Sequence, residues 1–253
     1  MKLLYERPGL PAFQIPEALI ALYGGGLGFK LPRVIANFVA SVDGVVALPI
    51  AAESGGVISQ GSEADRLVMG LLRACAGSVL IGAGTFRKGE GFWDAESIYP
   101  KEASAFGELR RKLGLSPRPL LAVVSASGDL DLAHPALQQD ALIVTTARGQ
   151  ARLGKARAKL LVQDTVDFAS VLAALPAGVV LCEGGPTLVG QLIGEGLLDE
   201  LFLTRSPYLF GRQKGDDRKA LIDGLEFHTS LELLSLRQDS SYLFLRYGIS
   251  RTA

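Results

Sequence analysis

The sequence has little of the chemistry that marks zinc proteins and disulfide-rich secreted proteins. It holds 2 cysteines and 2 histidines among 253 residues. Cys75 and Cys182 lie far apart and outside any CxxC pair, so we expect buried, reduced thiols and predict no metal site. His134 and His228 have no neighbouring Ser, Cys or carboxylate pattern that resembles a catalytic triad. The pattern therefore favours neither metal catalysis nor a hydrolytic nucleophile.

The sequence also lacks an excess of charge of either sign and lacks long hydrophobic runs. Its 26 Lys and Arg balance 26 Asp and Glu, which gives no indication of nucleic acid or an anionic membrane as a partner. No apolar run approaches the ~18 residues of a membrane span. Charges and prolines interrupt the first segment, "MKLLYERPGLPAF", where a signal peptide needs an apolar stretch. We expect a cytoplasmic protein, and a local basic pocket for a small anion stays compatible with a net charge of zero.

What the sequence does contain is enough apolar residues for a sizeable core, with 48% hydrophobic and 21% charged residues. Residues 1–32 are rich in Pro and Gly, include one expected short helix in "IPEALIALYGGG", and are interpreted as an N-terminal extension. From residue 33 on, short apolar runs alternate with amphipathic stretches. The runs predict strands at 33–40, 78–82, 119–125, 141–146, 159–163, 178–182 and 200–207, and helices at 62–77, 100–114, 165–175 and 186–196.

This alternation predicts an α/β fold. Short, nearly continuous apolar strands separated by helices indicate a sheet that is covered by helices on both faces. The segments "LELLSLRQ" and "SSYLFLRYG" near the end predict a hairpin that turns at Asp239 and Ser240. The sheet is therefore expected to be mixed but mostly parallel. No long linker follows residue 33, so residues 33–253 are expected to form a single domain.

Glycine-containing loops follow three of the predicted strands, and ligands of open α/β sheets bind at such strand ends. The loop "IGAGTFRKGEG" carries Thr85, whose hydroxyl could bond a phosphate. In "ASVDG", Asp43 is either a turn residue or a carboxylate at the mouth of a crevice. Arg73, on a predicted helix, is either solvated or a ligand for an anion. Glu183 follows an apolar strand, and its burial needs a partner, for which a ligand amine or hydroxyl is one candidate.

The third loop, "CEGGPT", has the features of a phosphate site. Glycines let backbone N–H groups approach a ligand closely, and Pro186 suits the first turn of a helix. The N–H groups of Gly184, Gly185, Thr187 and Leu188 are then expected to face outward at the positive end of a helix dipole. A sharp turn that binds no ligand is the alternative interpretation of these residues taken alone.

Together, these motifs resemble a known family. The segments at 37–47, 56–87 and 181–211 are similar to the reductase domain of riboflavin biosynthesis, which has a dihydrofolate-reductase-like fold. The resemblance implies NADPH as hydride donor and a homodimer. It also implies 5-amino-6-(5-phosphoribosylamino)uracil as substrate, with its ribose reduced to a ribityl chain. No HxE…PCxxC deaminase pattern precedes this region, so a stand-alone reductase is expected.

The resemblance also implies site residues. Asn37, Asp43 and Glu183 are expected at the reacting ribose, and Arg73 and Glu183 at the substrate, Arg73 near its phosphate. Phe92 and Trp93 offer further substrate contacts from the loop after Thr85. Arg87 and Arg148 are candidates for the 2′-phosphate of NADPH. The residues expected to line NADPH are Ala40, Val57, Ser59, Gly82, Gly84, Thr85, Arg87, Ser125, Gly184, Gly185, Pro186, Thr187 and Leu188.

Three departures from the family pattern leave other functions open. The chain has "SVDGVV" where the family often has "SLDG" followed by Lys or Arg, and Asn37 where bifunctional members often carry Lys. The loop "FRKGEGFWD" lacks the usual Asp-Pro. A dihydrofolate-reductase-like enzyme that reduces a pterin-like or other small heterocycle is therefore one alternative. A nucleotide-binding protein without catalytic activity is another.

Overall fold

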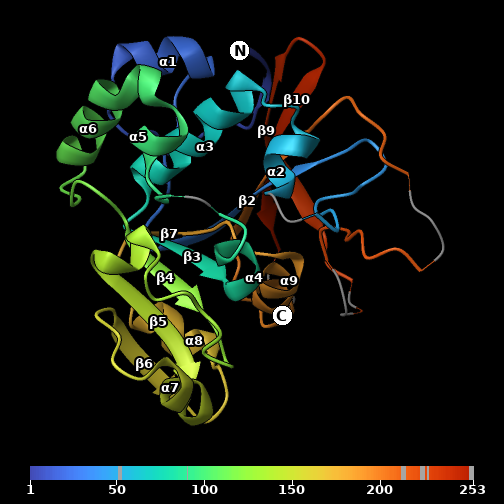
Figure 1. Ribbon diagram of the computed structural model, residues 1–253. Helices are drawn as coiled ribbons and strands as arrows, with labels where there is room; N and C mark the ends of the chain where they lie inside the picture. The colour runs from blue at the N-terminus through green and yellow to red at the C-terminus, as the bar shows by residue number, and fades with distance from the viewer. Residues whose placement is uncertain (51–52, 90, 212–214, 223–225, 227, 251–253) are drawn as a thin grey trace.

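The computed structural model describes residues 1–50, 53–89, 91–211, 215–222, 226 and 228–250. Its centre is a ten-stranded sheet in the order β1-β9-β10-β8-β2-β7-β3-β4-β5-β6 (Figure 1). The strands from β8 to β6 along this order run parallel, and β1, β9, β10 and β8 pair antiparallel. The prediction of a mixed, mostly parallel sheet is confirmed. The strands are β1 (Lys2–Glu6), β2 (Arg33–Ala40), β3 (Ser78–Gly82), β4 (Leu120–Val124), β5 (Ala141–Thr146), β6 (Lys159–Gln163), β7 (Val179–Cys182), β8 (Glu200–Arg205), β9 (Leu231–Asp239) and β10 (Tyr242–Ile249).

Helices connect the parallel strands and vary in length from one turn to thirteen residues in α3. Five of the helices, α1, α3, α6, α8 and α9, coincide with predicted helices, whereas α2, α4, α5 and α7, of 4 to 7 residues, were not predicted. The α-helices are α1 (Glu17–Tyr23), α2 (Ser54–Ile58), α3 (Glu63–Cys75), α4 (Ala83–Phe86), α5 (Ala95–Ile98), α6 (Ala103–Lys112), α7 (Ala147–Leu153), α8 (Phe168–Ala173) and α9 (Pro186–Gly194).

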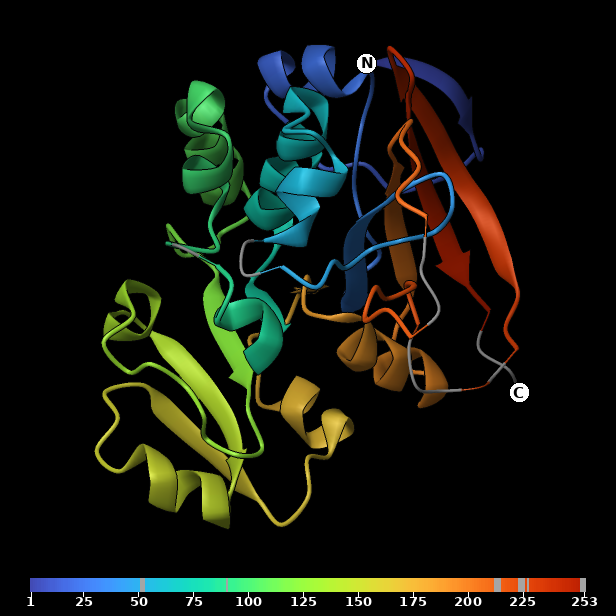
Figure 2. The same ribbon diagram turned by 45° about the vertical axis from the view of Figure 1, so that its right-hand side comes forward.

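The two faces of the sheet carry two apolar cores. Along β3, Val79 and Ile81 pack with α1, α3 and α6, whereas Leu80 packs with α8 and α9 on the opposite face. Figures 1 and 2 show α1, α3 and α6 as one group, with α8 and α9 apart from it. Both cysteines lie buried and unpaired in these cores, as predicted. The alternation of neighbouring strand residues between two cores explains the continuous apolar runs in the sequence.

The N-terminal segment shares the sheet and the core with the rest of the chain. Strand β1 pairs antiparallel with β9 at the edge of the sheet, and its five residues are all exposed. From α1, Leu19 and Tyr23 are buried in the core. The expected hairpin is present, with Asp239 opposite Tyr242 and a positive φ at Ser240. Residues 251–253 of the expected domain lie outside the described residues.

The parallel strands bring several loops to one edge of the sheet. The carboxyl ends of β2, β3, β4 and β7 point the same way, so the loops after Ala40, Gly82, Val124 and Cys182 meet there. In the described part of the chain, no helix is long and apolar enough to cross a membrane. Within the same residues, no three His, Cys, Asp or Glu side chains are grouped to hold a metal ion.

Candidate active site

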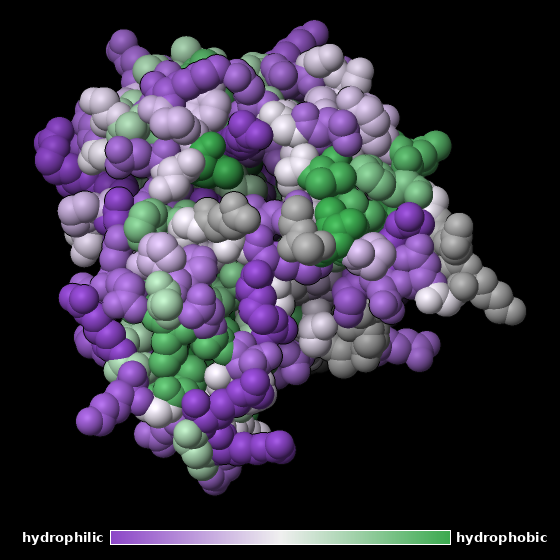
Figure 3. Space-filling view, in the orientation of Figure 1, coloured by the Kyte–Doolittle hydropathy of each residue, from purple (hydrophilic) through white to green (hydrophobic). Residues whose placement is uncertain are grey.

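A cleft of about 800 Å³ opens where these strand ends meet helices α3, α4 and α9. Figure 3 shows apolar side chains gathered beside α2, over the loops next to it, and residues 46–48 of the loop after β2 line the cleft. A mostly apolar cleft with a few polar groups is typical of a small-molecule site. Of the residues predicted to bind substrate or cofactor, those that line it are Asn37, Arg73, Gly82, Gly84, Thr85, Trp93, Glu183, Gly185, Pro186, Thr187 and Leu188.

The two positions of the "CEGGPT" loop that carry glycine require it for different structural reasons. A Cβ on Gly184 would lie 2.4 Å from the backbone N of Gly82 and from the Cα of Ile81, so only glycine lets this loop pack against β3. Gly185 has φ +40° and ψ 143°, a conformation that essentially only glycine adopts. Its N–H donates to Thr85 Oγ1 at 3.0 Å, rather than facing a ligand as predicted. The hydrogen bond instead joins the two glycine loops.

The first turn of α9 keeps free donors for an anion. The helix begins at Pro186, and the N–H groups of Thr187 and Leu188 lie in its first turn, where they have no intrahelical acceptors. At Gly82 and Gly84, which line the same cleft, a Cβ would meet nothing within 4 Å. Backbone donors beside open space fit the phosphates of a dinucleotide.

A buried hydroxyl next to these loops adds to that fit. Ser125 follows β4, and its Oγ is buried without a hydrogen-bond partner in the described structure. Its neighbour Val124 lines the cleft. Since buried polar atoms are nearly always hydrogen-bonded, a ligand or water is expected to complete this site. The residues present therefore fit a nicotinamide dinucleotide.

Arg73 and Glu183 form a buried ion pair at the floor of the cleft. Arg73 Nη2 and Glu183 Oε2 are 2.7 Å apart, and Arg73 Nε lies 3.1 Å from both carboxylate oxygens. Their side chains are only 8% and 6% exposed. A further donor, Arg73 Nη1, bonds the carbonyl of Asp94 at 3.2 Å. The partner that Glu183 needed is thus a residue of the protein itself, and the pair presents a fixed charge distribution to the cleft.

Asp65 is a cleft residue that sequence analysis missed. It lies in the first turn of α3, is only 4% exposed, and lines the cleft. Burial raises the pKa of Asp65 to about 6, because desolvation of the carboxylate outweighs the hydrogen bonds from Thr204 and Ser59. A signal was available: Asp65, Met69 and Arg73 recur every four residues, and all three line the cleft from one face of α3.

The raised pKa makes Asp65 a cost to stability at neutral pH. The folded state holds the proton up to about pH 6, whereas the unfolded chain releases it near its ordinary pKa of roughly 3.9. Stability contributed by this group is therefore lost as pH rises through this window, to a total of roughly 3 kcal/mol. We expect Asp65→Asn to be more stable than the wild type above pH 6 and similar to it near pH 4, measured by thermal melts across pH. A pH-independent difference would contradict the assignment.

Several predicted site residues lie outside the lining of the cleft. The carboxylate of Asp43 accepts from Ser41 Oγ and from the backbone N–H groups of Phe210 and Gly211. The Ser41 hydroxyl, followed by these N–H groups, lowers the pKa of Asp43. Asp43 therefore joins two loops in this structure, and its catalytic role stays a prediction. Ala40, Val57 and Ser59 are likewise absent from the lining residues.

The aromatic pair of the loop after Thr85 divides between two environments. Trp93 lines the cleft and stacks on Phe86 at 5.8 Å between ring centroids. Phe92 is not a lining residue of the cleft. Its ring instead lies under the guanidinium of Arg118, whose Cζ is 4.6 Å from the ring centroid. Arg87 donates to the backbone carbonyl of Asp129 at 3.1 Å.

Comparison with known proteins adds a family. A model of the RibD C-terminal domain matches residues 32–245. The 2,5-diamino-6-ribosylamino-4(3H)-pyrimidinone 5′-phosphate reductase of Archaeoglobus fulgidus is 29% identical over 206 residues, which cover 78% of this chain and 88% of that protein.

Solved structures share the fold. A pyrimidine reductase-like protein from Corynebacterium diphtheriae superposes with a TM-score of 0.69 at 22% identity, covering 87% of this chain and 93% of that one. RibD of Acinetobacter baumannii gives a TM-score of 0.64 at 21% identity, covering 87% of this chain and 58% of that one. At these identities the similarity concerns the fold.

Proposed function

The chain belongs to the RibD C-terminal domain family, and from this premise we propose that it is an NADPH-dependent reductase of riboflavin biosynthesis. The family resemblance seen in the sequence is confirmed. The substrate is a ribosylaminopyrimidine 5′-phosphate, whose ribose is opened and reduced to a ribityl chain. The observation that carries the proposal is the cleft itself, where two joined glycine loops lie beside the buried Arg73–Glu183 pair.

Different residues of the chain are proposed to bind the cofactor, bind the substrate and exclude water. When bound, the cofactor supplies the hydride. The first-turn N–H groups of Thr187 and Leu188 would hold its phosphates, and Ser125 Oγ would bond its adenosine side. The ion pair holds the Glu183 carboxylate in one orientation, from which it can accept a hydrogen bond from a substrate hydroxyl. Trp93 and Leu48 help to exclude water from the cleft.

The test of this function is NADPH oxidation with a panel of substrates. The panel contains the 2,5-diaminopyrimidinone and the 5-aminouracil forms of the ribosylamino 5′-phosphate, together with dihydrofolate. Turnover of either ribosylamino compound supports the proposal. Turnover of dihydrofolate alone would instead favour the pterin-reductase alternative, and NADPH binding without any turnover would favour a non-catalytic protein.

We expect NADPH to bind at least tenfold more tightly than NADH, a difference of about 1.4 kcal/mol. Arg148 lies exposed at the start of α7, just after β5, and its forked guanidinium suits the 2′-phosphate. Arg148→Ala is expected to remove most of the preference, measured by fluorescence titration of both cofactors. Arg152→Ala is the matched control, because Arg152 on the same helix pairs with Asp129.

Other outcomes reassign or remove this contact. A preference that survives Arg148→Ala but disappears in Arg87→Ala would place the contact at Arg87. Equal affinities of the wild type for the two cofactors would contradict the NADPH assignment.

A cytoplasmic homodimer is also proposed, from the family resemblance. A monomeric mass in light scattering would contradict the dimer.

A further inference from the structure

The proposed function leaves Asp65 without a role. The cofactor loops do not include it, and no lysine or arginine among the described residues forms an ion pair with it. Its carboxylate nevertheless lines the cleft, at 4% exposure, between helix α3 and strand β8. Burying a carboxylate without a cation costs free energy. A ligand that offers hydrogen-bond donors would therefore offset this desolvation cost.

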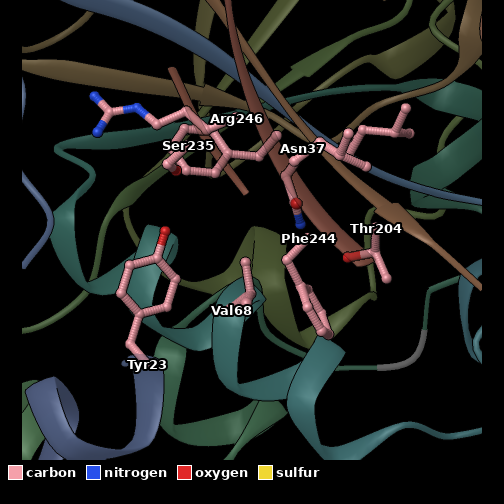
Figure 4. Close-up of a pocket in the computed structure, with 10 residues that line it drawn as sticks. Tyr23, Asn37, Val68, Thr204, Ser235, Phe244 and Arg246 are labelled. Atoms are coloured by element: carbon pink, nitrogen blue, oxygen red, sulfur yellow. The ribbon is translucent and has the colours of Figure 1, made fainter. Parts of the chain in front are cut away.

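The Asp65 carboxylate is held in place by hydrogen bonds that use only some of its acceptor positions. It accepts hydrogen bonds from the side chains of Ser59 and Thr204, and an ionised carboxylate has about four acceptor positions. Thr204 is 1% exposed on β8 and lies opposite Val39 of β2, two residues along that strand from Asn37. Figure 4 shows Asn37 and Thr204 turned toward the same small cavity, above Val68 of α3. The hydroxyls orient Asp65, and its remaining acceptor positions are available to a ligand.

The charges of the cleft restrict which part of the substrate lies against Asp65. The substrate has an anionic phosphate, a ribose and a heterocycle that carries N–H donors. A phosphate beside a buried carboxylate would be repelled, whereas Lys88 and Lys219 line the cleft and suit an anion. Asp65 therefore faces either the heterocycle or the ribose, and donors in a fixed fork are the better complement to a carboxylate.

We propose that Asp65 binds the 2-amino edge of the pyrimidine ring, so that this enzyme prefers the 2,5-diaminopyrimidinone substrate over the uracil. In a 2-amino-4(3H)-pyrimidinone, the exocyclic amino group and the neighbouring ring N–H form two parallel donors that match the two carboxylate oxygens. In the uracil, a carbonyl replaces the amino group and places an acceptor against the carboxylate, which leaves both groups unsatisfied. This inference rests on the proposed reductase function and specifies its substrate.

The preference should depend on pH. A protonated Asp65 donates one hydrogen bond and accepts another, which matches the N–H and C=O of the uracil. The groups that act on this carboxyl are Ser59 on the loop before α3, Arg66 on α3, Glu183 after β7, Thr204 on β8 and Tyr242 on β10. Glu183 favours the protonated form and Arg66 the ionised form. The discrimination against the uracil should therefore shrink as pH falls through about 6.

The experiment compares kcat/KM for the two substrates in the wild type and in Asp65→Asn. The wild type should favour the 2,5-diaminopyrimidinone by at least tenfold, since a good bidentate pair discriminates by roughly 10- to 100-fold. The amide of Asp65→Asn both donates and accepts, so this variant should lose the preference or reverse it, and its preference should no longer vary with pH near 6. Glu63→Gln is the matched control, because Glu63 lies two residues away, exposed, in a pair with Lys101.

A second measurement separates the heterocycle from the ribose. Inhibition by 2,5,6-triaminopyrimidin-4-one should weaken at least tenfold in Asp65→Asn, while 5,6-diaminouracil should inhibit equally or better. Thermal melts and NADPH titration show that the variant is folded and binds cofactor.

The outcomes distinguish this inference from the proposed function. If the wild type reduces neither ribosylamino substrate, the function itself fails. If the wild type reduces both substrates equally or prefers the uracil, the function stands but Asp65 does not bind the 2-amino edge. The same conclusion follows if Asp65→Asn lowers both activities by the same factor.

Discussion

Gly184→Ala is expected to cost the protein about 4 kcal/mol or more, a loss that few single substitutions reach. The added Cβ would lie 2.4 Å from Gly82 N and from Ile81 Cα, and both atoms belong to the backbone of β3 in the middle of the sheet. A strand with neighbours on both sides cannot move aside without breaking their hydrogen bonds. Thermal melts and the yield of soluble protein measure the effect.

The chain offers a matched control on the helix that follows the same loop. Gly194 is the last residue of α9, is exposed, and has nothing within 4 Å of an added Cβ. Gly194→Ala should leave stability unchanged or raise it by up to roughly 1 kcal/mol. If Gly184→Ala melts like the wild type, the close approach of this loop to β3 is not present in solution.

This contrast changes the interpretation of the glycine pair. The sequence left two explanations for the glycine pair, the approach of a phosphate or a sharp turn that binds no ligand, and each applied to both glycines alike. The structure assigns Gly184 to packing against β3 and Gly185 to a backbone conformation with positive φ. The open space that a phosphate needs lies instead at Gly82 and Gly84. A sequence can show that a loop must be free of Cβ atoms, but the atoms that would collide come from a strand about 100 residues away.

The parts of the fold that could be predicted are those with local causes. Apolar runs, most of them buried on both faces, identified the parallel strands, and the turn at Ser240 identified the hairpin. Strand β1 escaped prediction because its side chains are all exposed, and it is a strand only through its backbone pairing with β9, more than 220 residues along the chain.

The same distinction explains the two aspartates. Asp43 stood out in the sequence because it precedes a glycine, and the structure uses it to join two loops. Asp65 resembles an ordinary residue of a helix first turn, where acidic side chains are common. Its pKa is raised because the folded chain buries the carboxylate, which outweighs the hydrogen bonds from Ser59 and from Thr204 on β8. This burial exists only in the folded chain.

The buried pair of Arg73 and Glu183 is expected to show a large effect when one partner is removed. Glu183→Gln leaves the Arg73 guanidinium with its charge uncompensated at 8% exposure, and breaking such a pair costs about 3–5 kcal/mol. The melting temperature should fall by about 10 °C. Arg73→Met should do the same from the other side. Glu63→Gln breaks an exposed pair and should change the melting temperature little.

The double variant Arg73→Met with Glu183→Met separates stability from function. With both charges removed, neither is left unpaired, and apolar residues of similar volume often restore the stability of a buried pair. The melting temperature should therefore recover most of the loss. Turnover should not recover, because in the proposed function the Glu183 carboxylate accepts a hydrogen bond from the substrate and the Arg73 guanidinium orients that carboxylate.

The comparison of melting temperature with kcat/KM decides what the pair is for. A purely structural pair predicts that both quantities recover together in the double variant, at an unchanged NADPH affinity. A pair that serves the substrate predicts a stable protein that binds NADPH and turns over at least 100-fold more slowly, on the order of 2.7 kcal/mol in the transition state. Because the two charges lie at the floor of the cleft, held by four hydrogen bonds in all, we expect the second result.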